Sequence, residues 1–161
     1  MKLRRLKVVI ASILTGILCL ISTFSVSAES LLDDVIMRDS TETDADYSED
    51  TSYSRLRGNN LNYGTSTITK LSNIKVRVDG ITQCHHTCEK VYLELYLERK
   101  VDGVYCTYDS WEFVDYNVSS LSREIEVIVP SGYYYRVRGY HAAKDGSKEA
   151  TSTLTQGILV N

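Results

Sequence analysis

The chain has 161 residues, of which 43% are hydrophobic and 24% charged, and its net charge at pH 7 is −3. Residues 1–28 carry four basic side chains, residues 29–54 carry nine carboxylates and one arginine, and residues 55–161 are close to neutral. A near-neutral domain offers no basic surface for nucleic acid, and the sequence has no phosphate-binding loop, nucleophile elbow or His-Glu-x-x-His motif. We therefore expect no nucleic-acid partner, no cofactor and no enzymatic activity.

Residues 1–28 have the organisation of a secretory signal peptide, with a basic start, an apolar run from Val8 to Phe24 and small residues up to Ala28. The apolar run is at the short limit for a membrane span. We therefore predict cleavage after Ala28, secretion, and no membrane anchor in the mature protein. Residues 29–56 are rich in acidic and hydroxyl side chains and are predicted to form a disordered leader. Residues 57–161 remain as one domain.

Hydrophobic and polar residues alternate with a period of two in several segments of this domain, which indicates half-buried strands. Clusters of Gly, Asn, Asp and Ser separate these segments. About seven short strands in a domain of this size predict an all-β, antiparallel sandwich of the immunoglobulin-like or fibronectin-III-like class. The expected strands are 65–71, 74–79, 91–98, 105–116, 124–129, 133–138 and 150–160.

Asp102-Gly103 is a strong turn signal between two of these strands. A plain two-residue turn would place Trp111 on the face opposite the leucines of the preceding strand, so the register must shift by one residue. A three-residue loop with a left-handed Gly103 would pair Leu93 with Trp111. A two-residue turn with a bulge at 109–110 would pair Leu95 with Trp111, and this second solution is favoured.

The segment 131–141, which reads Ser-Gly-Tyr-Tyr-Tyr-Arg-Val-Arg-Gly-Tyr-His, begins at a turn around Gly132. The spacing of Tyr133, Tyr135 and Val137 resembles the tyrosine-corner strand of fibronectin type III modules. The resemblance implies that the Tyr133 hydroxyl turns back to the preceding loop, which is a structural role.

A wider resemblance rests on several short motifs: Arg-Gly-Asn-Asn-Leu-Asn-Tyr-Gly at 57–64, Lys-Val-Tyr-Leu at 90–93, Ser-Trp-Glu-Phe at 110–113, the segment 132–141, and Ser-Thr-Leu-Thr-Gln-Gly at 152–157. With these motifs the chain resembles a family of small secreted proteins of Gram-positive bacteria that has no assigned function. The resemblance implies an exported all-β domain and brings no catalytic residues.

Three cysteines follow the signal peptide, and cysteines of exported proteins usually pair. Cys84 and Cys88 enclose two histidines in what we expect to be a loop tip, where a curled backbone would allow a disulfide. Pairing of either residue with Cys106 is the alternative. A metal site that adds His85 or His86, with His141 as a distant ligand, is a further possibility, although its spacing does not match a structural zinc motif.

Tyr92, Tyr96 and Tyr108 are the candidate contact residues, because planar aromatic side chains beside carboxylates can stack on sugar rings. We accordingly expect a secreted, non-enzymatic interaction module for a glycan, the cell wall or a protein. A metal-binding or redox protein built on Cys84 and Cys88 is the alternative. The sequence does not determine the partner or the oligomeric state.

Overall fold

The computed structural model describes residues 41–54 and 58–161, which all lie in the second of the chain's two compact units, Val35–Asn161. Within the described residues there are eight strands and no helix, so the all-β prediction is confirmed. No described helix, accordingly, could cross a membrane. The strands are β1 (Glu42–Thr43), β2 (Tyr47–Tyr53), β3 (Leu61–Ser72), β4 (Lys75–Val101), β5 (Val104–Ile128), β6 (Tyr133–Asp145), β7 (Ser147–Leu154) and β8 (Gly157–Val160).

The segment predicted to be a disordered leader contains two of these strands. β2 pairs antiparallel with β3 over its whole length, and β1 pairs in parallel with β8. The prediction of disorder is therefore wrong for residues 42–43 and 47–53. Hydroxyl pairs such as Thr51 Oγ1 and Thr65 Oγ1, 2.9 Å apart, hold a strand that has little apolar surface. The predicted signal peptide lies outside the described residues.

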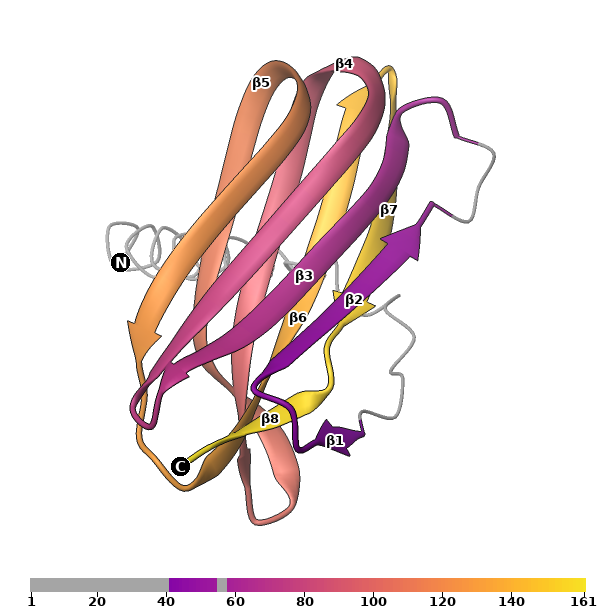
Figure 1. Ribbon diagram of the computed structural model, residues 1–161. Helices are drawn as coiled ribbons and strands as arrows, with labels where there is room; N and C mark the ends of the chain where they lie inside the picture. Colours follow the sequence, from indigo (N-terminus) through magenta and orange to yellow (C-terminus); the bar gives the residue numbers. More distant parts are fainter. Residues whose placement is uncertain (1–40, 55–57) are drawn as a thin grey trace, which may run out of the picture. The chain divides into compact units, whose positions relative to one another are not determined.

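The strands form one continuous sheet in the order β1-β8-β6-β4-β3-β2, with β5 added to β4 and β7 added to β6. β4 and β5 are the long elements, with 27 and 25 residues. The first part of β4 pairs with β3 and the end of β5, whereas its second part pairs with β6 and the start of β5. The β4–β5 hairpin therefore belongs to two layers of strands, which face each other (Figure 1).

Two features distinguish this sheet from the predicted antiparallel immunoglobulin-like sandwich. The β1–β8 pair is parallel, so the sheet is mixed. In addition, side chains of β2 form hydrogen bonds to β7, so that the sheet is nearly closed on one side. The Ser52 and Thr151 hydroxyls are 2.8 Å apart, and the Leu154 N–H donates to Asp50 Oδ2 at 2.8 Å. These bonds join the two layers along one side.

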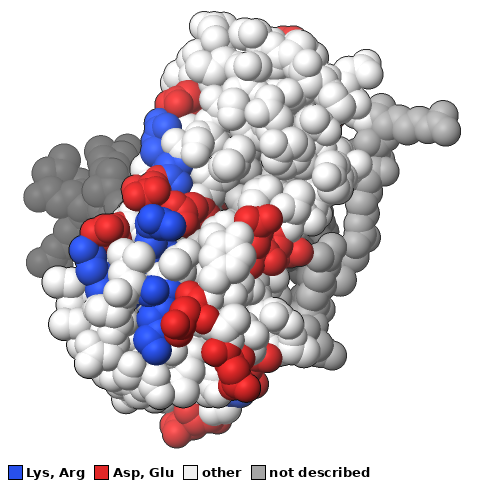
Figure 2. All heavy atoms as spheres, viewed as in Figure 1, with Lys and Arg blue, Asp and Glu red and all other residues white. Residues whose placement is uncertain are grey.

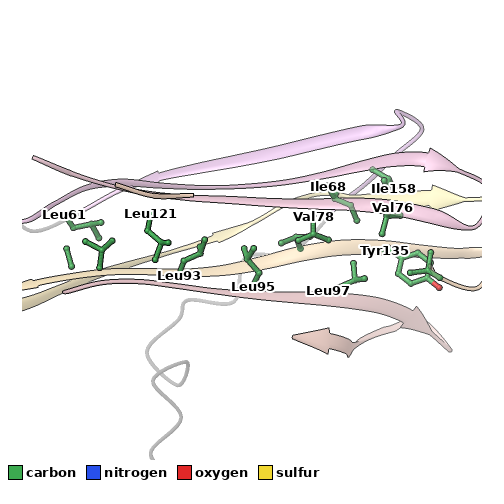
Figure 3. Packing of buried hydrophobic residues seen from close by; sticks show 14 of the residues in the cluster. Leu61, Ile68, Val76, Val78, Leu93, Leu95, Leu97, Leu121, Tyr135 and Ile158 are labelled. Carbon is green, nitrogen blue, oxygen red and sulfur yellow. The ribbon is translucent and has the colours of Figure 1, made fainter. Parts of the chain in front are cut away.

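The core lies between the layers, where Leu93, Leu95 and Leu97 of β4 meet Val76 and Val78 from the start of the same strand (Figure 3). All five side chains are fully buried. Burial of a side chain of this size stabilises the fold by about 1.5–3 kcal/mol. The alternation that predicted these strands thus marks the residues that face the core.

The β4–β5 turn has two residues, Asp102 and Gly103, both with positive φ (51° and 84°), and Val101 pairs with Val104. Positive φ at both central positions is the signature of a type I′ turn. The predicted structural role of Gly103 is consistent with this geometry.

The favoured hairpin register is confirmed, since Leu95 pairs with Trp111 and Leu93 with Phe113. The bulge lies one residue earlier than predicted. Leu97 pairs with Asp109 and Glu98 with Thr107, which leaves Tyr108 as the extra residue. The shift turns Trp111 and Phe113 towards the core, and both pack partly buried against it.

The tyrosine corner exists, but it is formed by a different residue from the predicted one. The hydroxyl of the fully buried Tyr135 donates to Pro130 O at 2.8 Å, whereas Tyr133 is 38% exposed beside Arg99. Tyr135 shares its face of β6 with the buried Val137, so it is the residue whose ring reaches the core. Gly132 has a φ of 88°, as the predicted turn requires.

Candidate interaction surfaces

Cys84 and Cys88 do not lie at a loop tip. They flank a bulge within β4, where Gln83 pairs with Ser120 and Cys88 with Val118, so four residues of β4 oppose one of β5. Both thiols are buried in the core cluster, with exposed fractions of 3% and 1%. Cys84, Cys88 and Cys106 all carry free thiols in this structure, so the predicted disulfide is not present.

The alternative pairings with Cys106 are incompatible with the sheet. Cys88 of β4 pairs with Val118 of β5, and Cys106 lies in β5 twelve residues before Val118. At about 3.3 Å per residue this separation is roughly 40 Å, whereas bridged cysteines have Cα atoms less than about 7 Å apart. Cys106 is exposed near the hairpin tip.

The histidines considered as metal ligands are not brought together with the thiols. His85 and His86 are exposed, and His86 Nε2 lies 3.1 Å from Asp145 Oδ2. No group of three His, Cys, Asp or Glu side chains in residues 41–54 and 58–161 could hold a metal ion. The described residues thus give the metal hypothesis no ligand set.

His141 is instead the centre of a polar cluster inside the core. Thr82 Oγ1 donates to Tyr92 O at 2.9 Å, so it accepts from His141 Nδ1 at 3.1 Å. Nε2 then accepts from Ser66 Oγ at 3.3 Å, and Ser66 Oγ in turn accepts from Thr153 Oγ1 at 2.6 Å, while Thr153 Oγ1 lies 2.9 Å from Nε2. Burial lowers the pKa of His141 to about 3, so the ring is neutral at pH 7. Since the ring has no solvent exposure, this cluster is structural.

Two glycines make room for the cluster. A Cβ at Gly64 would clash with the His141 ring, and one at Gly139 would clash with Ser66 Oγ. Both glycines belong to motifs that carried the family resemblance in the sequence. Those motifs therefore mark an internal packing requirement.

The motif at 58–61 has a structural role as well. The buried Glu149 carboxylate of β7 accepts from three successive backbone N–H groups, those of Asn59, Asn60 and Leu61, at 2.9–3.1 Å. A Cβ at Gly58 would clash with this carboxylate. Charge-assisted bonds of this kind are the stronger ones in proteins, so Glu149 anchors the start of β3 to β7.

Tyr92 and Tyr96 lie on the outer face of β4, and each ring is partly covered by a cation. Lys148 Nζ is 4.4 Å from the Tyr92 ring, and the Arg138 guanidinium is 4.5 Å from the Tyr96 ring. The Tyr96 hydroxyl donates to Glu94 at 2.8 Å, and burial together with this bond raises its pKa to about 12. These contacts leave both rings only partly accessible.

Tyr108 is not part of the same surface. Its ring meets the Tyr135 ring edge to face, with centroids 6.0 Å apart, and lies 5.1 Å from the Arg99 guanidinium. Tyr135 and Arg99 occupy inward positions of β6 and β4, whereas Tyr96 faces outward. The structure therefore separates Tyr108 from the other two predicted contact residues.

Next to Tyr96, the outer face carries a compact ion triad. Glu98, which is only 6% exposed, accepts from Arg136 Nε at 2.6 Å and Arg138 Nε at 2.9 Å. The Arg136 guanidinium lies 4.0 Å from the Tyr105 ring. The two guanidinium groups share one carboxylate, so the triad is a packed polar layer with a net charge of +1.

β5 is the least covered part of the sheet. Among the described strands it pairs with β4 alone, so its second edge has no strand partner over either layer. Large apolar side chains on it are exposed, including Tyr116 (59%) and Ile128 (73%). An Arg123–Asp115 pair, with two N···O distances of 3.0 and 3.1 Å, spans this open side. Sequence reasoning missed this surface because alternation does not show which strand lies at an edge.

Charge is distributed differently on β5 and on the neighbouring face. Figure 2 shows acidic and basic side chains interleaved in one band of the viewed face, next to a large uncharged area. Ion pairs such as Lys75–Glu126 and Arg77–Asp79 join side chains of opposite charge on the described strands. β5 itself carries five carboxylates and one arginine, so its edge is acidic.

The described residues form an all-β domain built on one mixed sheet. The sequence matches a family of unknown function, DUF6147, over residues 33–157, and the chain belongs to this family. No curated protein matches it. Among solved structures it is similar to the sporulation control protein Spo0M from Bacillus subtilis, with 11% identity and a TM-score of 0.36 over 73% of this chain. The chain spans about half, 51%, of that structure's length.

Proposed function

We propose that this protein is an exported, non-enzymatic binding module, and that its partner is a protein segment that adds to β5 as an extended strand. The single observation that carries the proposal is the edge of β5, which lacks a strand partner along its 25 residues in the described structure. An exposed edge offers unpaired backbone N–H and C=O groups to another chain. The signal-like residues 1–28 support export.

The chemistry of β5 selects the partner. It carries five carboxylates and only one arginine, so antiparallel pairing with β5 of a second copy would bring two acidic strands together. Like charges directly opposite each other destabilise a strand pair. The complementary partner is therefore a basic segment with alternating apolar residues, which could also contact exposed positions such as Val114 and Tyr116.

The two-layer arrangement also supports a relationship to the immunoglobulin-like sandwich. The tyrosine corner at Tyr135 and the two facing layers of strands are features that an immunoglobulin-like or fibronectin-III-like sandwich would have. We infer that the mixed sheet is a variant of that architecture, in which β1 and β2 are added and the β2–β7 side is closed.

A peptide-binding experiment tests the proposal on the full chain. The probes are two short peptides, one of alternating lysine and valine and one of alternating glutamate and valine. We expect the lysine peptide to bind, to shift the amide resonances of β5, and to bind more weakly as salt is added. Binding of both peptides alike, or shifts confined to other strands, would overturn the proposal.

Charge reversal supplies the matched control. Glu112→Lys lies on β5 and should weaken binding several-fold, whereas Asp44→Lys makes the same change at an exposed site between β1 and β2 and should have no effect. Concentration-dependent self-association through β5 would instead identify a second copy as the partner and contradict the basic-segment proposal.

A glycan remains the second candidate, because Tyr92 and Tyr96 lie four residues apart on one face with Glu94 between them. Replacing both tyrosines by alanine removes contacts on the outer face and leaves the core intact. Loss of retention on cell-wall glycans without a lower denaturation midpoint would support the glycan. Unchanged retention would refute it.

A further inference from the structure

The bulge in β4 brings two thiols into the core at the point where this strand passes from one layer to the other. Between Gln83 and Cys88 the chain advances five residues, while its partner β5 advances only two, from Ser120 to Val118. At about 3.3 Å per residue, a span that would be roughly 17 Å in a regular strand is compressed to about 7 Å. Cys84 and Cys88 lie inside this compressed span.

The orientation of the two side chains agrees with the compression. Both are buried members of the same hydrophobic cluster. The Cys88 S–H donates to His86 O at 3.6 Å, and the neighbouring Cys88 contributes, after burial, to the raised pKa of the Cys84 thiol. Two buried thiols at the ends of a compressed segment of one strand meet the first requirement for a disulfide, which is a short separation of the two Cα atoms.

We propose that Cys84 and Cys88 form an intramolecular disulfide that fixes the β4 bulge, and that Cys106 stays outside it. The oxidant is a disulfide donor, either a small molecule or a thiol–disulfide oxidoreductase. One cysteine attacks the donor as thiolate and releases one donor thiol, and the second cysteine then attacks the mixed disulfide and releases the other. Two protein thiols lose two electrons, which reduce one donor disulfide to two thiols.

Burial of the two thiols determines when the disulfide can form. Burial raises the pKa of both thiols, that of Cys84 to about 12, so the folded protein holds little thiolate. The bond should therefore form while the chain folds, or when the bulge opens, and be shielded from reductants afterwards.

The test equilibrates the full chain, unfolded in denaturant and then refolded, with a series of reduced and oxidised glutathione mixtures. Remaining thiols are alkylated, and the intact mass and the linked peptides are measured. We expect Cys84 and Cys88 to convert together to one linked peptide, while Cys106 stays alkylated or carries glutathione. The oxidised form should have a higher urea midpoint than the reduced form.

Single variants make the outcome decisive. Cys106→Ser should oxidise as the natural chain does, whereas Cys84→Ser should leave Cys88 as an alkylated thiol or glutathione adduct. If Cys84 and Cys88 in Cys106→Ser remain alkylated, or each carries glutathione, across the whole series, the proposal is wrong. A link from Cys106 to either residue would also overturn it.

Discussion

His141 should make this fold sensitive to mild acid, because its neutral ring is built into the core. The folded-state pKa is about 3, whereas an unfolded histidine titrates near 6.5. A lowered pKa means that the unfolded chain binds the extra proton more readily, so the stabilisation is complete above pH 6.5 and is lost as the pH falls towards 3. The value of pH 5 lies about 1.5 units below the pKa of an unfolded histidine. Protonation of the unfolded chain therefore lowers the free energy of unfolding by about 2 kcal/mol at this pH.

The assay compares urea denaturation at pH 7 and pH 5, followed by the fluorescence of Trp111, the only tryptophan. The natural chain should lose about 2 kcal/mol more unfolding free energy than His141→Gln between these pH values. His85→Gln, at an exposed site, should behave as the natural chain does. The ring nitrogens of His141 should also keep the neutral NMR signature at pH 5.

Equal losses in the natural chain and His141→Gln would refute this reasoning. So would a protonated His141 ring in the folded protein at pH 5. Carboxylates that titrate in the same range contribute to both chains and cancel in the comparison.

Three further predictions concern the fold, and all are measured by urea denaturation. Tyr135→Phe removes the corner hydrogen bond and should cost about 1–2 kcal/mol, whereas Tyr133→Phe should change little; equal effects would contradict the corner assignment. Leu95→Ala should cost about 2–5 kcal/mol, and Ile128→Ala, at a site 73% exposed, well under 1 kcal/mol; the reverse order would invert the assigned faces. Glu149→Gln should destabilise the fold and speed hydrogen exchange of the amides it holds; unchanged exchange at these amides would count against the anchor.

Much of the strand arrangement was predictable because each strand buries one face. The alternation around Leu93 and Leu95 gives the inward set directly, and the need to bury Trp111 on the same side was enough to select the register of the β4–β5 hairpin. The predicted position of the bulge was wrong by one residue. The observed bulge places the Tyr108 ring against the Tyr135 ring of β6, and the local sequence pattern does not indicate this contact.

The candidate site was less predictable. Tyr92, Tyr96 and Tyr108 looked equivalent by residue type, yet the bulge sends Tyr108 to the opposite side from the other two. Cys84 and Cys88 were expected at a loop tip, because a run of polar residues between two apolar stretches is the usual sign of a turn. In the structure that run is a bulge inside one long strand.

The amino-acid sequence by itself determined an all-β chain, its main strands and a turn at Asp102-Gly103, because these depend on period-two burial and on local backbone preferences. Only the tertiary structure decided which segments without a hydrophobic pattern become strands, which histidine is buried and which strand is left at an open edge. These outcomes depend on partners far away in the chain: β2 is held by β3 and β7, His141 by Ser66 and Thr82, and the edge of β5 is defined by the absence of a strand beside it in the described residues.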